Sequence, residues 1–282
     1  MSVPISPLAP RDIAHLFGPL LGELLAVLRS LSPSDWDRPT VAGRWRVRDV
    51  AAHLLDGDLR KLAACRDEHR LPLDGPLDTD SDLARFINGL NRSGVAYATR
   101  LSPRLLLELL ATSGAWVAEF ISTLPPHGPS MFPVSWAGEA VSENWMDTGR
   151  EYTERWHHQM QIRDAVGAPL LLAAPWMDPL LDFSVRALPH AYAALPAPTG
   201  TTVVLDVHGE TAGAWSLVRG DRAWQVYRGR PASADAVVRV STDDAWRLFY
   251  NALPASEVLA RVHVTGAAAL ADPLLRTRSV IL

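Results

Sequence analysis

The chain has 282 residues, of which 48% are hydrophobic and 21% charged, and its formal net charge is −4. This composition is typical of a soluble protein with a substantial core, and the length allows one large or two medium-sized domains. The sequence has no block of basic residues, which argues against binding to nucleic acid or to an anionic membrane surface.

The N-terminal segment and the single cysteine exclude further classes. Residues 1–10 hold three prolines and no cationic stretch, so we expect no signal peptide, and no apolar run reaches the roughly 20 residues that span a bilayer. We therefore expect a cytoplasmic protein. Cys65 has no partner cysteine for a disulfide or a zinc cage, and we interpret it as a small buried residue. A reactive thiol would then come from outside the protein.

The first part of the chain predicts helices. Apolar residues recur every three or four positions over residues 12–31, and the same spacing predicts a second helix over 47–68. A shorter helix is expected over 81–97. Ser102 followed by Pro103 is a strong start signal for a helix that ends at about residue 124.

The second part of the chain changes its pattern. A long helix is predicted over 143–166, ending before Gly167, and another over 175–194. Short β-branched and aromatic runs then predict strands, followed by a helix over 242–251 and mixed structure. We therefore predict an α plus α+β fold, with a helical bundle over residues 1–195 and a smaller α+β domain over 196–282. The predicted strands are 201–208, 213–219, 223–227 and 236–241.

The helix predicted over 143–166 carries a polar stripe with spacings of four, three, four and three residues. Residues three or four apart lie on one face of a helix, so Glu154 and His158 project side by side and could ligate one cation. The pair formed by Glu154 and His157 is geometrically possible too. The alternative is a solvated surface face. The stripe consists of Asp147, Glu151, Glu154, His158 and Gln161.

His53 is a candidate third ligand. It falls at the edge of the apolar stripe of the second predicted helix, where a histidine is usually half-buried with its hydrogen bonds satisfied. In a helical bundle it would also supply the third inward group of a metal site. Two histidines and one carboxylate would leave open coordination positions, which is typical of catalytic sites.

Three segments together resemble a known family. WRVRDVAAHL at 45–54, REYTERWHH at 150–158 and VHVTGAAAL at 262–270 are similar to segments of the mycothiol-dependent maleylpyruvate isomerases. That family belongs to the DinB-like four-helix-bundle superfamily and has a sterol-carrier-like C-terminal domain. The resemblance implies a zinc-type site with His53, Glu154 and His158 as ligands, and it favours His158 over His157.

Two positions differ from the family's pattern. Family members often have an aspartate three residues after the second ligand histidine, where this chain has Gln161. A basic residue that isomerases present from the C-terminal domain has no clear match near Asn251 and Ala252. Both differences weaken the case for maleylpyruvate itself as the substrate.

The resemblance implies a thiol-dependent metalloenzyme that acts on a small molecule. A divalent metal (zinc first, with nickel and iron as alternatives) would activate mycothiol or bacillithiol for isomerisation of, or S-transfer to, an electrophilic substrate. Arg150, Arg155 and Asn91 are candidates for holding an anionic substrate or the sugar of the thiol, with surface or capping contacts as the alternative.

Two other functions fit the residues. The first is a non-catalytic protein that binds an apolar ligand, with ten tryptophans available to line its site. The second is a metal-dependent hydrolase on the same three ligands, for which Glu151 is the nearby candidate for a general base. A monomer and a homodimer are both compatible with the sequence.

Overall fold

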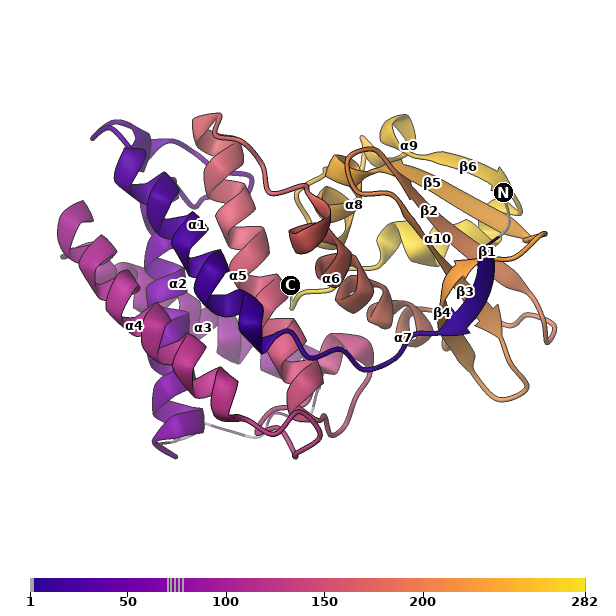
Figure 1. Ribbon diagram of the computed structural model, residues 1–282, viewed down its shortest axis with the longest axis horizontal. Coiled ribbons are helices and arrows are strands. Elements are labelled where there is room, and N and C mark those ends of the chain that lie inside the picture. Colours follow the sequence, from indigo (N-terminus) through magenta and orange to yellow (C-terminus); the bar gives the residue numbers. More distant parts are fainter. Residues whose placement is uncertain are drawn as a thin grey trace. The chain divides into compact units, whose positions relative to one another are not determined.

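The computed structural model of the chain describes residues 3–69, 71, 73, 75, 77 and 79–281. Its described residues form two compact units, which are shown in Figure 1. The helical unit comprises residues 12–132 and 142–170. The sheet unit comprises residues 3–11, 133–141 and 171–281.

The helices predicted for the first part of the chain are confirmed, with small shifts at their ends. The second helix ends earlier than predicted, at Lys61, and continues as a single π-helical turn, Leu62–Arg66. The helices of the helical unit are α1 (Phe17–Ser30), α2 (Val47–Lys61), α3 (Asp80–Ala98), α4 (Pro103–Thr123) and α5 (Asn144–Val166).

Local signals account for two of the helix ends. The hydroxyl of Ser102 accepts a hydrogen bond from the backbone N–H of Leu105 at 3.3 Å, which caps the start of α4. Gly167 has a φ of 69° after the last turn of α5, a left-handed conformation that glycine adopts without strain. The predicted start of α4 and end of α5 are thereby confirmed.

Helix α2 lies at the centre of the helical unit, where it contacts α3, α4 and α5. Its Val50 and Leu54 are buried with Leu28 of α1 and Leu110 of α4 in one hydrophobic cluster. Burying a side chain of this size stabilises the fold by about 1.5–3 kcal/mol. Ile162 of α5 belongs to the same cluster, which therefore also fixes α2 against α5, the helix that carries the polar stripe.

Helix α4 is the one helix among the described residues that is long and apolar enough to cross a bilayer. A core helix of a soluble protein passes the same test. In the bundle, α4 contributes Leu106, Leu110, Val117 and Ile121 to the buried core.

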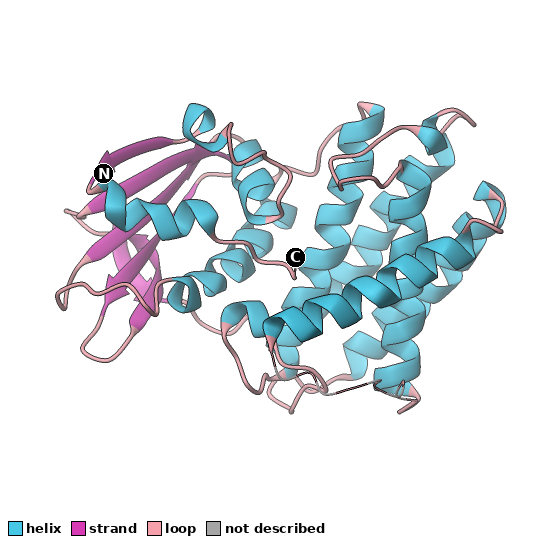
Figure 2. Ribbon diagram, turned by 180° about the vertical axis from the view of Figure 1, so that it is seen from behind, coloured by secondary structure: helices cyan, strands magenta, loops and turns pink. Residues whose placement is uncertain are grey.

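The sheet unit contains a six-stranded sheet in the order β1-β4-β3-β2-β5-β6. Strands β2 and β5 pair in parallel and all other neighbours are antiparallel. The four predicted strands are confirmed, and the colouring of Figure 2 separates them from the helices. The strands are β1 (Val3–Pro7), β2 (Thr202–His208), β3 (Gly213–Arg219), β4 (Trp224–Arg230), β5 (Ala236–Ser241) and β6 (His263–Gly266).

Two strands were not predicted, and both lie at an edge of the sheet. Strand β1 contains Pro4 and Pro7, which cannot donate to a neighbouring strand and are tolerated only where one side of the strand is unpaired. Strand β6 has only four residues. The alternation of apolar and polar residues that identifies a strand is too short in both.

The sheet unit also contains helices on the N-terminal side of residue 196. Helix α6 (Ala174–Ser184) contacts α8 (Thr242–Phe249), and α7 (Leu188–Ala191) contacts β4 and α10 (Ala268–Arg276). The segment predicted as one helix over 175–194 is divided by a 3₁₀ turn, Val185–Ala187. The fold class is as predicted, but the compact units do not divide at residue 196, because the apolar residues of α6 and α7 pack within the sheet unit.

The N-terminal segment is held in the sheet unit by charge. Arg11 contacts Asp178 at 3.1 Å and Asp182 at 2.7 Å, both on α6. Arg228 of β4 pairs with the same two carboxylates, and Trp215 donates to Asp182 from its indole nitrogen. This network holds the segment that follows β1 beside α6 and β4.

Asn251 and Ala252, where the chain has no match to the basic residue of the family's pattern, lie at the end of α8. Asn251 has a φ of 55°, in the left-handed region, and the backbone N–H of Ala252 donates to the carbonyl of Arg247. Asn251 and Ala252 therefore have a structural part in terminating this helix.

Candidate metal centre

The polar stripe of α5 is buried inside the helical unit. Asp147, Glu151, His158 and Gln161 are each exposed by 7% or less, and the side chain of Glu154 is exposed by 35%. The stripe is therefore not a solvated surface face. A buried row of ionisable groups must be compensated by opposite charges, hydrogen bonds or a bound cation.

His53 comes to this stripe from α2. The start of α2 is fixed by Asp49, whose carboxylate accepts a hydrogen bond from the backbone N–H of Arg46 at 2.9 Å. Val50 and Leu54 bury the apolar face of the helix, so His53 is carried to the side of α2 that faces α5, where it is 5% exposed. The motif that precedes His53 therefore positions the histidine by capping and packing.

The three expected ligands converge. The Nε2 atoms of His53 and His158 each lie 3.2 Å from the same oxygen, Oε1 of Glu154. One nitrogen or oxygen from each of the three side chains lies within 4.8 Å of the others, so the three could hold a metal ion together. The structure thus brings together the three residues named from the sequence.

Trp45 forms an aromatic wall beside the two histidines. The centroid of its ring lies 4.9 Å from that of His53 and 6.1 Å from that of His158. The rings of His53 and His158 are themselves 4.5 Å apart. An apolar wall of this kind limits the access of water to the ligand atoms.

The electrostatic surroundings keep lone pairs available on the ligand atoms of His53 and Glu154. Burial lowers the pKa of His53, and the neighbouring His158 lowers it further. Burial alone would raise the pKa of Glu154, but hydrogen bonds from His158 and His53 outweigh burial and hold this pKa well below its ordinary value. At neutral pH, therefore, His53 is a neutral imidazole and Glu154 a carboxylate, which are the ionisation states of metal ligands.

The Nδ1 atom of His157 faces a backbone carbonyl, although its ring packs against that of His158. This Nδ1 lies 2.9 Å from the carbonyl oxygen of Thr153, one turn earlier on α5, and 4.0 Å from Oε2 of Glu154. Burial lowers the pKa of His157 to about 3. The geometry favours His158 over His157 as the partner of Glu154.

The other end of the stripe belongs to a buried charge network. Lys61 Nζ lies 2.5 Å from Asp147 and 3.7 Å from Glu151. Arg150 pairs with both Asp147 and Glu151, at 2.7 and 2.6 Å. Arg155 pairs with Glu151 and, at 2.7 Å, with Asp58, which also accepts from Ser113. Three cations therefore balance three carboxylates.

Glu154 stands outside this balance. Among the described residues its hydrogen bonds and ion pairs are with histidines only, namely His53, His158 and, at the longest distance, His157. No arginine or lysine among the described residues makes an ion pair with this carboxylate. Two imidazole nitrogens and a carboxylate oxygen form a donor set that suits a divalent cation, so the residues present fit a metal ion.

The candidate substrate-binding residues are engaged within the protein. Arg150 and Arg155 are held by the carboxylates of the network, and Asn91 accepts a hydrogen bond from Arg60 at 2.8 Å. For Glu151, burial would raise the pKa, but Arg150, Lys61 and Arg155 outweigh it and lower the pKa. A carboxylate stabilised by three cations is a poor general base.

The network contains residues that the sequence analysis did not single out. Lys61, Asp58 and Ser113 have no motif around them, and only one observation could have drawn attention to Lys61, which is the only lysine in the chain. Cys65 is half-buried, and burial raises the pKa of its thiol. This protonated thiol agrees with the interpretation of Cys65 as a packing residue.

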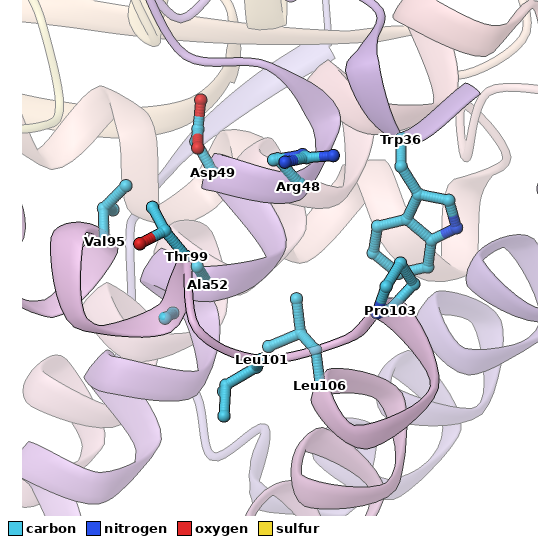
Figure 3. Close-up of a pocket in the computed structure, with 10 residues that line it drawn as sticks. Trp36, Arg48, Asp49, Ala52, Val95, Thr99, Leu101, Pro103 and Leu106 are labelled. Atoms are coloured by element: carbon cyan, nitrogen blue, oxygen red, sulfur yellow. The ribbon is translucent and has the colours of Figure 1, made fainter. Parts of the chain in front are cut away.

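A cavity of about 50 Å³ lies elsewhere in the helical unit and is shown in Figure 3. Its walls come from α2, α3, α4 and the turn before α2, and they include Trp36, Asp49, Ala52 and Leu106. A second cavity, lined by Leu24, Asp58 and their neighbours, measures about 20 Å³. Both are far smaller than the roughly 300 Å³ at which ligand pockets begin.

Comparison with known proteins gives matches in sequence and in fold. Residues 17–163 match the model of the mycothiol maleylpyruvate isomerase N-terminal domain. No curated protein sequence matches the chain. The crystal structure of the mycothiol-dependent maleylpyruvate isomerase is similar over 83% of this chain and 86% of that one, with 13% identity and a TM-score of 0.53. The crystal structure of a histidine-to-alanine mutant is similar over 89% of this chain and 91% of that one, with 12% identity and a TM-score of 0.56. At such identities the likeness shows a shared fold.

Proposed function

The chain belongs to the mycothiol-dependent maleylpyruvate isomerase family, and on that premise we propose that it is a metalloenzyme that activates a low-molecular-weight thiol. His53, Glu154 and His158 hold a divalent metal ion. The thiol is mycothiol, with bacillithiol as the alternative, and the substrate is a small electrophile. The product is either an isomer of the substrate or its thiol adduct.

The observation that carries this proposal is the convergence of two imidazole nitrogens on one carboxylate oxygen of Glu154, each nitrogen 3.2 Å from it. Two nitrogens and one carboxylate oxygen suit zinc best and also accommodate nickel or iron. Three protein ligands leave coordination positions for a further group. When bound, such an ion stabilises a coordinating thiol as its thiolate at neutral pH.

The residues of this chain prepare the site in three ways. Glu154 is the ligand with the exposed side chain, at 35%, so an incoming molecule reaches the cluster on its side. Trp45 shields the buried histidine rings from water. The oxygen of the Gln161 amide lies 2.8 Å from Nδ1 of His158 and orients that ring.

The reaction follows from the chemistry of a thiolate. The sulfur forms a bond to an electrophilic carbon of a conjugated double bond, and the electron pair moves to the carbonyl oxygen as an enolate. The former double bond is now single and rotates. Loss of the same thiolate regenerates the double bond in the other geometry, so the thiol is returned unchanged. If a proton is added to the enolate carbon instead, the adduct remains and the outcome is S-transfer.

The structure bears on one of the two competing functions. A hydrolase on the same ligands needs a general base, and Glu151 is already paired with three cations. This observation favours the thiol-dependent enzyme over the hydrolase.

The test starts from the metal content of the purified full-length protein. We expect one zinc per chain, lost in a His158→Ala variant whose circular dichroism is unchanged. The cobalt-substituted protein is then titrated with mycothiol and bacillithiol, and with S-methyl mycothiol as a control that has no free thiol. A new sulfur-to-cobalt absorption with either free thiol supports the proposal. If cobalt is bound stoichiometrically but its absorption spectrum does not change on addition of either thiol, the proposal is overturned.

A further inference from the structure

A row of residues on α2 continues from the metal cluster toward the end of the helix. His53, Gly57 and Arg60 follow one another at spacings of four and three residues, so they share one face of α2. Long side chains on a helix lean toward its N-terminus. Accordingly, Nε of Arg60 lies 2.8 Å from Oδ2 of Asp56, one turn earlier. The guanidinium is therefore carried back along α2 toward Gly57 and His53.

Gly57 leaves open space on this face of α2. A Cβ atom at Gly57 would meet no atom within 4 Å, although the residue is half-buried. Glycine is unfavourable in the interior of a helix, and no neighbouring element requires it at this position. The open space lies along α2 between the ligand His53 and Arg60.

Arg60 is held in place but retains unused donors. Its Nη2 donates to Oδ1 of Asn91 on α3 at 2.8 Å, and Asp56 lies beside its Nε. Helix α3 passes close to α2 here, since a Cβ atom at Gly94 of α3 would overlap the carboxylate of Asp56. Among the described residues the Nη1 group has no hydrogen-bond or ion-pair partner, and 26% of the side chain is exposed. A guanidinium fixed in this way presents N–H groups to one more acceptor.

The charge of Arg60 acts at the metal cluster. Burial is the main cause that lowers the pKa of His53, His158 is the next, and the positive charge of Arg60 contributes in the same direction. Because a Coulombic influence falls with distance, this observation agrees with a guanidinium near the cluster. Arg150 and Arg155, in contrast, are committed to the carboxylates of the buried network.

We propose that Arg60 binds a carboxylate group of the ligand, and that the rest of the ligand lies over Gly57 beside the metal cluster. This inference rests on the proposed function and names its substrate class, which is an electrophile that carries a carboxylate as well as its conjugated double bond. A guanidinium binds a carboxylate through two parallel N–H donors, which fixes the orientation of the ligand as well as its position. A carboxylate could also come from the thiol, since bacillithiol carries carboxylates and mycothiol carries none.

Two pairs of variants of the full-length protein test the proposal. Arg60→Met removes the guanidinium and keeps the apolar stem. Its control is Arg48→Met, because Arg48 is also on α2 in an ion pair, with Asp37. Gly57→Leu fills the open space. Its control is Gly22→Leu in α1, where a Cβ atom also meets no atom within 4 Å.

Circular dichroism and urea denaturation establish that each variant is folded. Gly57→Leu should be at least as stable as wild type, because leucine favours a helix interior more than glycine does. A loss of ligand binding in this variant therefore cannot be a loss of structure. If Arg60→Met did not fold, Arg60→Lys would take its place, since lysine keeps the charge beside Asp56 but cannot donate through two parallel N–H groups.

The affinity of the metal-free protein for maleate, measured by calorimetry, is the first readout. Hydrogen bonds to a charged group typically change affinity by about ten- to hundredfold. We therefore expect Arg60→Met and Gly57→Leu each to bind maleate at least about tenfold more weakly than wild type. Arg48→Met and Gly22→Leu should match wild type. Binding of the uncharged dimethyl maleate should not depend on Arg60.

Titration with bacillithiol separates the two sources of the carboxylate. A loss in Arg60→Met for maleate but not for bacillithiol supports the proposed substrate class. A loss for bacillithiol alone would assign the subsite to the thiol and overturn that substrate class. Equal affinities of wild type and Arg60→Met for both molecules would overturn the inference as a whole.

Both titrations use metal-free protein because a carboxylate can also ligate zinc. They therefore decide the part of Arg60 even if wild type bound no zinc, an outcome that would refute the proposed function instead.

Discussion

The amino group of Lys61 lies 2.5 Å from the carboxylate of Asp147, and both side chains are only 5% exposed. Burial opposes the charged form of Lys61, but Glu151 and Asp147 outweigh it and raise the pKa of this lysine. Lys61 is thus charged at neutral pH and joins α2 to α5 at the end of α2 that follows His53. The charge network and the metal cluster lie along the same pair of helices.

Replacing Lys61 by methionine should therefore destabilise the protein. Removing one partner of a buried ion pair leaves the other charge uncompensated, and we expect a loss of about 3 kcal/mol in the free energy of unfolding. Urea denaturation followed by circular dichroism measures it. Arg104→Ala is the control, because its pair with Glu108 is exposed and should contribute nothing measurable. A Lys61→Met protein as stable as wild type would show that the network is not charged as described.

The same network predicts how stability depends on pH. The pKa of Glu151 is lowered in the folded protein relative to its ordinary value of 4.5. Its ionised form therefore stabilises the fold above about pH 4.5, and this contribution is lost as the pH falls toward the lowered value. Glu151→Gln should be less stable than wild type at neutral pH, with a shallower decline on acidification. Urea denaturation between about pH 3.5 and pH 6 tests this, and two parallel curves would contradict it.

Glu154 differs from Glu151 in its partners, which are histidines. Hydrogen bonds from His158 and His53 outweigh burial and lower its pKa, so Glu154→Gln should cost the metal-free protein some stability at neutral pH. It should also abolish stabilisation by zinc, which for wild type amounts to about 2.7 kcal/mol at 100 times the dissociation constant. Thermal unfolding with zinc and after chelation provides the comparison. If zinc raised the melting temperature of wild type and Glu154→Gln equally, the ion would bind elsewhere.

The sequence predicted most of the helical unit because its helices follow their own local signals. The stripe on α5, the Ser102 cap and Gly167 all act within a few residues of where they stand. Strands β1 and β6 were missed because an edge strand is defined by its partner: β1 pairs with β4, which is over 200 residues away.

In the candidate site, too, residues close together in sequence could be predicted together, whereas residues far apart could not. Periodicity alone could pair Glu154 with His158, which are four residues apart on one helix. His53 is 101 residues from Glu154, and it was placed beside that residue by a family resemblance rather than by periodicity. Arg150 and Arg155 were considered for binding a substrate although Asp147 and Glu151 stand within four residues of them on α5, at spacings that allow ion pairs. Only Asp58 of α2, the second partner of Arg155, is set by tertiary packing, which a single sequence does not display.

Trp45 offers a direct spectroscopic test of where the metal binds. Its ring centroid is 4.9 Å from that of His53, so an ion at the cluster would lie close to this indole. Open-shell cobalt quenches a nearby tryptophan, whereas closed-shell zinc does not. The emission of Trp45 is obtained as the difference between wild type and a Trp45→Phe variant, because nine other tryptophans contribute to the total. We expect this difference to fall on addition of cobalt and to persist with zinc. A difference spectrum that is the same with both ions would place the metal away from His53, Glu154 and His158.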